Sequence, residues 1–386
     1  MTGSDNRYDV IVLGVGGMGS ATTYHLADRG LDVVGLDQYN IPHARGSSHG
    51  STRVFNLALR GEPAYAALAR RADELWDELE ERSPEQLRWQ TGTLRGWPSA
   101  TYDGLRGTLE EAVDVSEALG LEYERLSGAE VSARFPGFQP PDEYRFLHHS
   151  AGGMLDVERC VSAHVQAAVA AGADVRARER VTGWEVDGGT VRVETARAAY
   201  EADHLVVTAG PWAPTALPAL ADHLDVYRSV MAWFTPRTPE PFRPAAFPAF
   251  SMDTRGGYFY GTPIHELPGV KVGGSASLDD RTPVDPDAVD LTPEAGDAAE
   301  LRAYVADVFP DAAGAPTRVE PCLLTYSPDS DFIIDRHPDH EQVLVACGFS
   351  GSGFMVSAAV GETLARLVSG ESLEYDLEAF SVDRLE

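Results

Sequence analysis

The pattern of hydrophobic and polar positions predicts that the chain opens with a βαβ unit. Asp9–Leu13 is a short apolar run rich in β-branched residues, as expected of a buried parallel strand. A glycine-rich turn follows, then Ala21–Ala27 with helical character, and then Asp32–Leu36 as a second strand. A parallel pair joined by a helix is the unit from which doubly wound sheets are built.

Further segments with the hydrophobic pattern of buried strands occur later in the chain. Val181–Glu194 alternates around Asp187-Gly188-Gly189, which predicts a hairpin, and His204–Thr208 reads as a buried strand. Val343–Cys347 reads as another strand, and an amphipathic helix is expected around Ser357–Val368. Neither end of the chain alone makes a complete sheet, so both are expected to form one discontinuous domain.

The segment Pro211–Pro321 differs from both ends because it is rich in proline and aromatic residues. Its strand-like pieces are Val226–Thr235, Gly257–Gly261 and Val270–Gly273. This pattern predicts a second domain built on an antiparallel sheet. At 386 residues the chain is long enough for two such domains.

Charge excludes two classes of partner. The formal net charge of −29 would repel nucleic acid and anionic lipid headgroups. Scattered carboxylates at this density are typical of halophilic proteins, which they keep solvated in strong salt. The sequence has no run of about 18 apolar residues, and its first residues are polar, so no membrane association and a cytoplasmic location are expected.

The strongest single motif is Gly14-Val15-Gly16-Gly17-Met18-Gly19, between the first strand and the first helix. Gly14 permits a tight turn, Gly16 lets a pyrophosphate approach the backbone, and Gly19 lets helix and strand pack closely. Asp37 ends the second strand, near the spacing expected of an acid that binds a ribose hydroxyl. Together these features predict a dinucleotide site, but they leave open which dinucleotide it is.

Three further observations concern chemistry. The stretch Ile41–Arg53 has the small and polar composition of an extended segment that lines a polar cofactor. Cys160, Cys322 and Cys347 form no CxxC pair, so neither a disulfide framework nor a metal site is expected. Lys271 is the single lysine among 31 basic residues, which suggests a position where arginine cannot substitute.

The sequence resembles the D-amino-acid-oxidase superfamily of flavoproteins, and within it the monomeric sarcosine oxidase and N-methyltryptophan oxidase group. The residues that carry the resemblance keep their order over essentially the whole chain. They are GVGGMG at Gly14–Gly19, GSSHGSTR at Gly46–Arg53, TAGPW at Thr208–Trp212, YFYG at Tyr258–Gly261, Cys322–Asp335, and GFSGSGF at Gly348–Phe354.

The resemblance implies FAD, attached covalently through Cys322, and a catalytic role for Lys271 in activating molecular oxygen. It places His49 and Arg53 against the flavin on the face opposite the substrate, and Tyr260 in the substrate pocket. The cofactor-binding residues expected from the motifs and the resemblance are Gly14, Gly16, Gly19, Asp37, Ser47, Ser48, Arg53, Ala209, Gly210, Cys322, Gly348, Gly351, Gly353, Phe354 and Met355. For Cys160 and Cys347 only a role as small buried hydrophobic residues is expected.

The substrate-handling positions depart from the family pattern. The arginine and lysine that clamp a substrate carboxylate correspond to Asn56 and Met355, and neither residue can balance a charge. A pocket histidine corresponds to Ser275, and a pocket tyrosine corresponds to Leu324. Burying an unpaired carboxylate there would be costly, so we expect a substrate other than sarcosine. Two alternatives stay open: a larger or more apolar amine, and an amino acid whose carboxylate meets another arginine.

The fold expected is α/β, with a discontinuous Rossmann-type FAD-binding domain (1–85, 150–215 and 322–386) and an antiparallel-sheet α+β substrate domain (86–149 and 216–321). The function expected is oxidation of a secondary amine or N-methyl amino acid by FAD and molecular oxygen, in a monomer or weak oligomer. Two alternatives stay open: a flavin amine dehydrogenase that uses another electron acceptor, and a protein that binds FAD without turnover.

Overall fold

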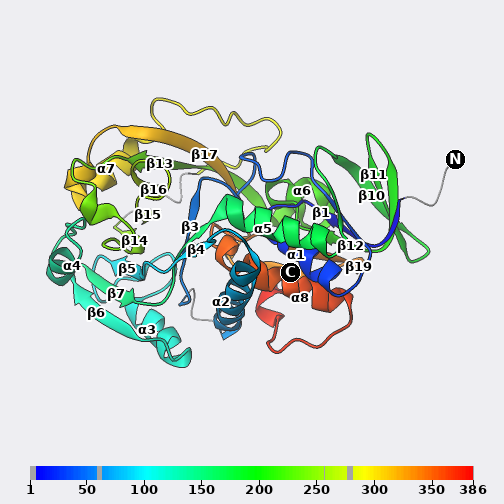
Figure 1. Ribbon diagram of the computed structural model, residues 1–386, viewed down its shortest axis with the longest axis horizontal. Coiled ribbons are helices and arrows are strands. Elements are labelled where there is room, and N and C mark those ends of the chain that lie inside the picture. Colours follow the sequence, from blue (N-terminus) through cyan, green and yellow to red (C-terminus); the bar gives the residue numbers. More distant parts are fainter. Residues whose placement is uncertain (1–5, 59–62, 256, 276–280, 386) are drawn as a thin grey trace.

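The computed structural model describes residues 6–58, 63–255, 257–275 and 281–385. Two large sheets lie side by side along the longest axis of the molecule (Figure 1). The helices are α1 (Gly17–Asp28), α2 (Pro63–Arg82), α3 (Leu109–Ala118), α4 (Gly128–Arg134), α5 (Val157–Ala170), α6 (Ala213–Ala216), α7 (Ala299–Val308) and α8 (Ser357–Val368). No helix within the described ranges is long and apolar enough to cross a bilayer.

The first sheet, sheet A, has a parallel centre in the order β19-β12-β1-β2-β9. The hairpin β10-β11 pairs with the first half of β12, and β18 pairs with β19 at the edge. Its strands are β1 (Arg7–Leu13), β2 (Val33–Leu36), β9 (Asp174–Arg176), β10 (Val181–Asp187), β11 (Thr190–Thr195), β12 (Ala199–Val207), β18 (Ile333–His337) and β19 (His340–Cys347). The predicted βαβ unit, hairpin and C-terminal strand are confirmed, and α8 has the predicted bounds.

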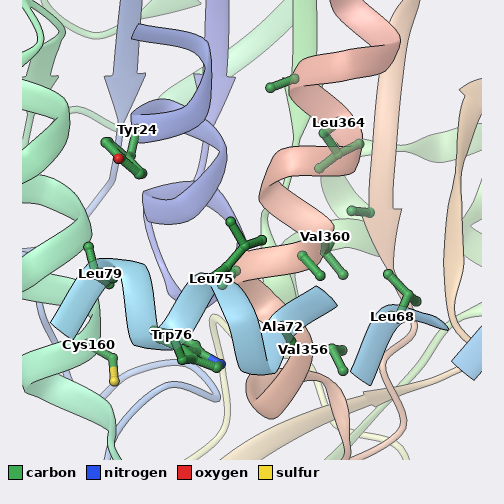
Figure 2. Close-up of a cluster of buried hydrophobic side chains, with 14 of the residues drawn as sticks. Tyr24, Leu68, Ala72, Leu75, Trp76, Leu79, Cys160, Val356, Val360 and Leu364 are labelled. Carbon is green, nitrogen blue, oxygen red and sulfur yellow. The ribbon is translucent and has the colours of Figure 1, made fainter. Parts of the chain in front are cut away.

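Helices α1, α5 and α8 pack together against sheet A, and α2 crosses them (Figure 2). Leu68, Ala72, Leu75 and Leu79 of α2 are buried at intervals of three and four residues, which is the spacing of one helix face. Helices α1 and α8 approach closely because Gly361 has no side chain. A Cβ there would lie 2.6 Å from the Ala21 backbone.

The second sheet, sheet C, has the order β17-β13-β16-β15-β14-β5-β7-β6. Its strands are β5 (Thr93–Trp97), β6 (Tyr123–Ser127), β7 (Arg145–His149), β13 (Asp225–Phe234), β14 (Ala249–Thr254), β15 (Gly257–Thr262), β16 (Val270–Ser275) and β17 (Pro316–Tyr326). The sequence predicted an antiparallel sheet, and all pairs are antiparallel except β5 with β14. A small sheet, β3 (Thr52–Phe55), β8 (Gly153–Asp156) and β4 (Arg88–Trp89), lies between the two large ones.

The two faces of sheet C differ because side chains alternate along each strand. One face is apolar and packs against α7, with Phe234, Phe250 and Val272 in its core. The register places directly opposed residues of neighbouring strands on the same face, so Arg95, Ser251, Tyr260 and Gly273 form one row across the other face. This second face carries most of the polar residues of sheet C.

One expected domain boundary, at residue 322, falls within a continuous strand of sheet C. The sequence assigned residues from 322 onward to the FAD-binding domain, but β17 continues to Tyr326 and pairs with β13 along its whole length. Cys322–Tyr326 therefore belong to sheet C, because breaking a continuous ladder in its middle would leave backbone groups unpaired. The rest of the division into two domains stays a proposal.

Candidate functional site

A cavity of about 1030 Å³ runs from the carboxyl edge of sheet A to the polar face of sheet C. Parallel strands of a doubly wound sheet present their carboxyl ends at one edge, where ligands of such sheets bind. The turns after β1, β2, β12 and β19 all line this cavity. Its volume lies at the upper end of the usual range for ligand sites, about 300–1,000 Å³.

The glycine turn after β1 has the geometry that its sequence predicts. Gly14 has φ +90°, and a Cβ there would lie 2.6 Å from the Thr208 carbonyl oxygen. A Cβ at Gly19 would lie 1.7 Å from the Gly14 oxygen, so only glycine lets α1 begin so close to β1. At Gly16, by contrast, a Cβ would meet nothing closer than the Ser48 Oγ at 3.7 Å. Gly16 lines the cavity, so its bare backbone leaves room for a ligand.

Asp37 lies at the carboxyl end of β2 and lines the cavity, as expected of a ribose-binding acid. Its carboxylate accepts hydrogen bonds from the backbone N–H groups of Val15 (2.9 Å) and Tyr39 (2.8 Å). These bonds fix the orientation of the carboxylate and tie the glycine turn to the end of β2. A carboxylate has about four acceptor positions, so two hydrogen bonds leave capacity for a hydroxyl group.

The segment Gly46–Arg53 was expected to be extended, but it is a connection of bends that leads into β3 at Thr52. Ser48 Oγ accepts a hydrogen bond from the Gly17 N–H at 3.1 Å, and Ser47 Oγ donates to the Leu323 carbonyl of β17. Arg53 donates to the carbonyl oxygens of Ser47 (2.6 Å) and Thr52 (2.9 Å). Arg53 is therefore held by backbone carbonyls, and within the described ranges no carboxylate forms an ion pair with it.

The structure brings most of the expected residues together around the cavity. The expected residues that line it are Gly14, Gly16, Asp37, Ser47, Ser48, Arg53, Ala209, Gly210, Tyr260, Gly348, Gly351, Gly353, Phe354 and Met355. Four expected residues do not line it: Gly19, which acts in packing, and His49, Lys271 and Cys322. The last three are almost completely buried.

Lys271 lies on β16 with its side chain on the cavity-side face of sheet C, in the same strand as Gly273. Its Nζ donates to the Gly50 carbonyl oxygen at 2.8 Å and to the Thr52 carbonyl oxygen. Burial, reinforced by the nearby Arg53 charge, lowers the pKa of Lys271 well below its usual range. The fully buried ammonium thus fixes the loop between Gly50 and Thr52.

A carboxylate supports the same loop from its other side. Glu158, in the first turn of α5, accepts hydrogen bonds from the N–H groups of Gly50 (2.9 Å) and Ser51 (3.1 Å). Gly50 and Ser51 both have positive φ, at 88° and 67°. Glu158 therefore binds the N–H groups of this turn, and Lys271 binds its carbonyl groups.

His49 and Cys322 complete the buried group beside this loop. His49 Nδ1 lies 3.8 Å from a Glu320 carboxylate oxygen, and burial lowers the pKa of the imidazole. Cys322 packs against Met231 and Trp233, and burial raises the pKa of its thiol. Cys322 shares a face of β17 with Leu324, which lines the cavity. The other two cysteines, Cys160 and Cys347, are free and buried, as expected for small hydrophobic residues.

The positions that depart from the family pattern do line the cavity. Asn56, Ser275, Leu324 and Met355 all contribute to its wall. Trp76 of α2 donates its indole N–H to the Met355 carbonyl oxygen at 2.9 Å, so the helix core positions this wall. Asn56 forms a local turn with Ala58, whose N–H donates to the Asn56 side chain at 3.1 Å.

Sequence reasoning missed five arginines that line the same cavity: Arg95, Arg106, Arg180, Arg228 and Arg281. Arg228 forms a bidentate ion pair with Asp297 at 2.6 and 2.8 Å. Arg281 stacks on Tyr227 and Tyr326. One signal could have found Arg95, because it interrupts the otherwise apolar strand Thr93–Trp97.

Within the described ranges, one group of three side chains has the spacing of a metal site: Asp156, His265 and Glu266. His265 Nε2 lies 3.1 Å from an Asp156 carboxylate oxygen. Arg159 forms ion pairs with Asp156 and with Glu266, so a cation already balances both carboxylates. The group is explained as an ion-pair network.

The residues at the carboxyl edge of sheet A fit FAD. The open backbone at Gly16 and the N-terminus of the 12-residue helix α1 suit a pyrophosphate, and Asp37 suits a ribose. Gly210 leaves a second open position on the cavity wall, since a Cβ there would meet nothing within 4 Å.

The comparisons with known proteins agree with this fit. The family model for FAD dependent oxidoreductases (DAO) matches residues 9–367. Monomeric sarcosine oxidase from Bacillus sp. (strain B-0618) is 34% identical, over 98% of this chain and 96% of that protein. Human peroxisomal sarcosine oxidase is 31% identical, over 100% and 98%. N-methyl-L-tryptophan oxidase from Salmonella typhi is 30% identical, over 98% and 99%.

Solved structures show the same fold. NikD, described as an unusual amino acid oxidase essential for nikkomycin biosynthesis, superposes in its open form with a TM-score of 0.83, at 26% identity over 97% of each chain. L-proline dehydrogenase from P. horikoshii has a TM-score of 0.82 at 21% identity, also over 97% of each chain, and supports the fold alone. With the family match spanning residues 9–367 and relatives above 30% identity over nearly the full length, this chain belongs to the DAO family of FAD-dependent oxidoreductases.

Proposed function

We propose that this protein is an FAD-dependent oxidase of a secondary amine or an N-methyl amino acid. The observation that carries the proposal is the continuity of the cavity. It joins the nucleotide-binding edge of sheet A to the polar face of sheet C, so that a small substrate can lie beside a bound dinucleotide. The relatives named sarcosine oxidase and N-methyl-L-tryptophan oxidase support the same class of substrate.

The reaction balances as follows. The substrate R–CH₂–NH–R′ loses a hydride equivalent and a proton to give the imine R–CH=N–R′. When bound, FAD would supply the redox chemistry, with molecular oxygen as the final acceptor of the two electrons and hydrogen peroxide as the product. Water then hydrolyses the imine to an aldehyde and a primary amine.

The chain's own side chains act by position and charge. Burial raises the pKa of Tyr260 above its usual range, so its hydroxyl stays protonated and can donate a hydrogen bond but cannot act as a base. Lys271, when protonated, supplies a cation where negative charge develops on oxygen. Arg53 supplies a second fixed cation on the cavity wall, oriented by the Ser47 and Thr52 carbonyls.

We also propose that Cys322 holds FAD covalently. Its strand is tied to the cofactor-binding segment by the Ser47–Leu323 hydrogen bond, and Leu324 on the same face lines the cavity. The expected result is a yellow protein whose colour stays in the pellet after trichloroacetic acid precipitation. In the Cys322→Ser protein the flavin should appear in the supernatant. Release of all flavin from the unaltered protein would refute the linkage but leave FAD binding intact.

A second candidate function, amine dehydrogenation with another electron acceptor, is favoured by one observation. Lys271 is bonded to two carbonyls, lies outside the cavity wall, and has a pKa lowered by burial. A neutral lysine would not stabilise negative charge on oxygen. Slow reoxidation of the reduced protein in air, with fast reoxidation by an added quinone, would favour this candidate.

The decisive experiment is an anaerobic screen of secondary amines that follows the flavin absorbance band. An amine substrate should bleach the band, and admission of air should restore it with one equivalent of hydrogen peroxide. Secondary amines that carry no hydrogen on either carbon next to nitrogen serve as the control, because no hydride can leave from them. If no secondary amine bleaches the band, the protein binds FAD without this turnover.

We expect sarcosine to be a poorer substrate than bulkier secondary amines, because Asn56 and Met355 stand where the family places its two cations. Saturation by micromolar sarcosine would contradict this expectation. The protein is further proposed to act as a cytoplasmic monomer or weak oligomer. Its carboxylate-rich surface should keep it soluble in strong salt.

A further inference from the structure

The sheet C end of the cavity contains two arginines that have no anionic partner within the described part of the chain. Arg95 lies in the middle of β5, only 5% exposed, and Arg106 is half-buried in the loop that precedes α3. Both line the cavity. The protein has 60 acidic residues against 31 basic ones, so two cavity arginines without a carboxylate within 4.0 Å call for an explanation.

The contacts that these arginines make leave hydrogen-bonding capacity unused. Arg95 donates from one terminal nitrogen to the Arg106 carbonyl oxygen and stacks over the Trp97 ring at 4.6 Å. Arg106 stacks over the Tyr258 ring at 5.1 Å. The Nε atoms of both guanidinium groups are buried and have no hydrogen-bond partner among the described residues. A buried donor without a partner is unfavourable unless a ligand supplies an acceptor.

Asp253 interacts electrostatically with both arginines, and Glu111 interacts with Arg95, but neither carboxylate forms an ion pair with them. One of the Asp253 oxygens accepts the Leu105 N–H at 2.9 Å. Burial raises the pKa of Asp253 and lowers the pKa of Arg95 to about 10. The charges of Arg95 and Arg106 are therefore offset only by carboxylates that form no ion pair with them among the described residues.

The strand register gives the position of these charges relative to the reaction site. Arg95 is opposite Ser251, which in turn is opposite Tyr260. Neighbouring strands are about 4.8 Å apart, so the backbones at Arg95 and Tyr260 are roughly 10 Å apart. An anion held by the arginines would therefore lie some distance from a C–N bond oxidised near Tyr260.

We propose that Arg95 and Arg106 bind an anionic group of the substrate at the sheet C end of the cavity. The substrate class is then a secondary amine whose carboxylate is separated from the oxidised C–N bond by a spacer of several atoms. Guanidinium groups suit this role because their planar donors match both oxygens of a carboxylate. This inference rests on the proposed amine oxidation, and it explains why Asn56 and Met355 can lack charge: the carboxylate is bound elsewhere.

The test compares matched amines in anaerobic flavin reduction. The probes are sarcosine, ω-(methylamino)butanoate and ω-(methylamino)hexanoate, and the neutral control is N-methylhexylamine, in which a methyl group replaces the carboxylate. In the unaltered protein the half-saturating concentration of the best long carboxylate should be at least tenfold below that of N-methylhexylamine. Equal values for the two would overturn the proposal.

Variants show whether the two arginines cause this preference. Arg106→Gln should raise the half-saturating concentration of the long carboxylate tenfold to a hundredfold and leave that of N-methylhexylamine and the limiting reduction rate within twofold. Arg106→Lys should recover part of the loss, because it keeps the charge without the planar fork. Arg302→Gln, an exposed position on α7, is the matched loss of one positive charge away from the cavity and should change neither probe. An equal effect of Arg106→Gln on both probes would refute a role in anion binding.

Calorimetric titration of the oxidised holoenzyme with ω-(methylamino)hexanoate, without oxygen, separates this inference from the proposed function. Binding that weakens in Arg106→Gln supports the anion site even if no amine bleaches the flavin, in which case only amine oxidation fails. Bleaching by neutral amines, with carboxylate binding unchanged in the variant, would refute the anion site alone.

Discussion

The walls at the two ends of the cavity differ in how much backbone and how many side chains they contain. At the sheet A end the wall includes open backbone at Gly16 and Gly210, in turns that follow parallel strands. At the sheet C end the wall consists of side chains such as Arg95, and these come from strands far apart in the sequence. Substitutions change backbone contacts less than side-chain contacts, so a side-chain site can change its ligand through a few substitutions. The comparison therefore predicts that cofactor binding and substrate choice can be altered independently.

The largest effect is expected from a substitution that fills the sheet A end of the cavity with a side chain. Gly16→Val adds a side chain to the cavity at a residue whose φ of −81° suits any amino acid, so the fold should be kept. Flavin affinity should fall by a hundredfold or more, because the side chain occupies the space of a pyrophosphate. Flavin absorbance per mole of protein, together with the melting temperature, checks this.

The matched control is Gly296→Ala, since a Cβ there would meet nothing within 4 Å and the residue does not line the cavity. It should keep its full flavin content. Normal flavin content in Gly16→Val would show that the open backbone at the sheet A end is not the cofactor site.

The next effect concerns Lys271, which lies between the two ends. Lys271→Met removes the charge and should slow reoxidation by oxygen on the order of a hundredfold, about 3 kcal/mol in the barrier. Reduction by substrate should change only modestly. Stopped-flow mixing of reduced protein with oxygenated buffer measures the first step alone. An unchanged reoxidation rate would show that Lys271 does not activate oxygen.

The same lysine predicts a pH dependence. Only the protonated form supplies the cation, so reoxidation should slow as pH rises through the pKa of Lys271. Burial lowers that pKa, so the fall should begin at a lower pH than for a solvated lysine. A profile that stays flat up to the ordinary lysine range would mean that another group supplies the charge.

A smaller effect should follow from returning the family's cations to the cavity wall. The double variant Asn56→Arg, Met355→Lys should lower the half-saturating concentration of sarcosine about tenfold or more, since hydrogen bonds to charged groups contribute about 1.5–3 kcal/mol each. Met355 is 9% exposed, so part of this gain is offset by burying the ammonium. Anaerobic flavin reduction with sarcosine and with N-methylhexylamine measures this change. If the half-saturating concentration fell equally for both amines, the added positive charges would not be the cause.

The smallest effect is expected at Tyr260. Tyr260→Phe keeps the ring on the cavity wall and removes only the hydroxyl, whose raised pKa excludes it as a base. The limiting reduction rate should fall by no more than about tenfold, the equivalent of one neutral hydrogen bond. A loss of several orders of magnitude would show that the hydroxyl takes part in proton transfer.

The amino-acid sequence by itself determined the sheet A end of the cavity. Gly14, Gly16 and Gly19 follow a strand and precede a helix. The positive φ of Gly14 and the close approach of Gly19 to the Gly14 oxygen are local requirements for glycine. Asp37 follows at a fixed distance because one helix and one strand have fixed lengths. The helix Ser357–Val368 was predicted with its observed bounds, since its apolar spacing is a local property.

The tertiary structure alone decided the sheet C end. Arg95, Ser251 and Tyr260 are more than a hundred residues apart at their extremes, and only the pairing of β5, β14 and β15 places them in one row. It also decided that β17 extends sheet C through Cys322, and that Lys271 donates to the backbone of the loop held by Glu158. Strand register is a long-range property, because it is fixed by which strands become neighbours and not by the residues within any one of them.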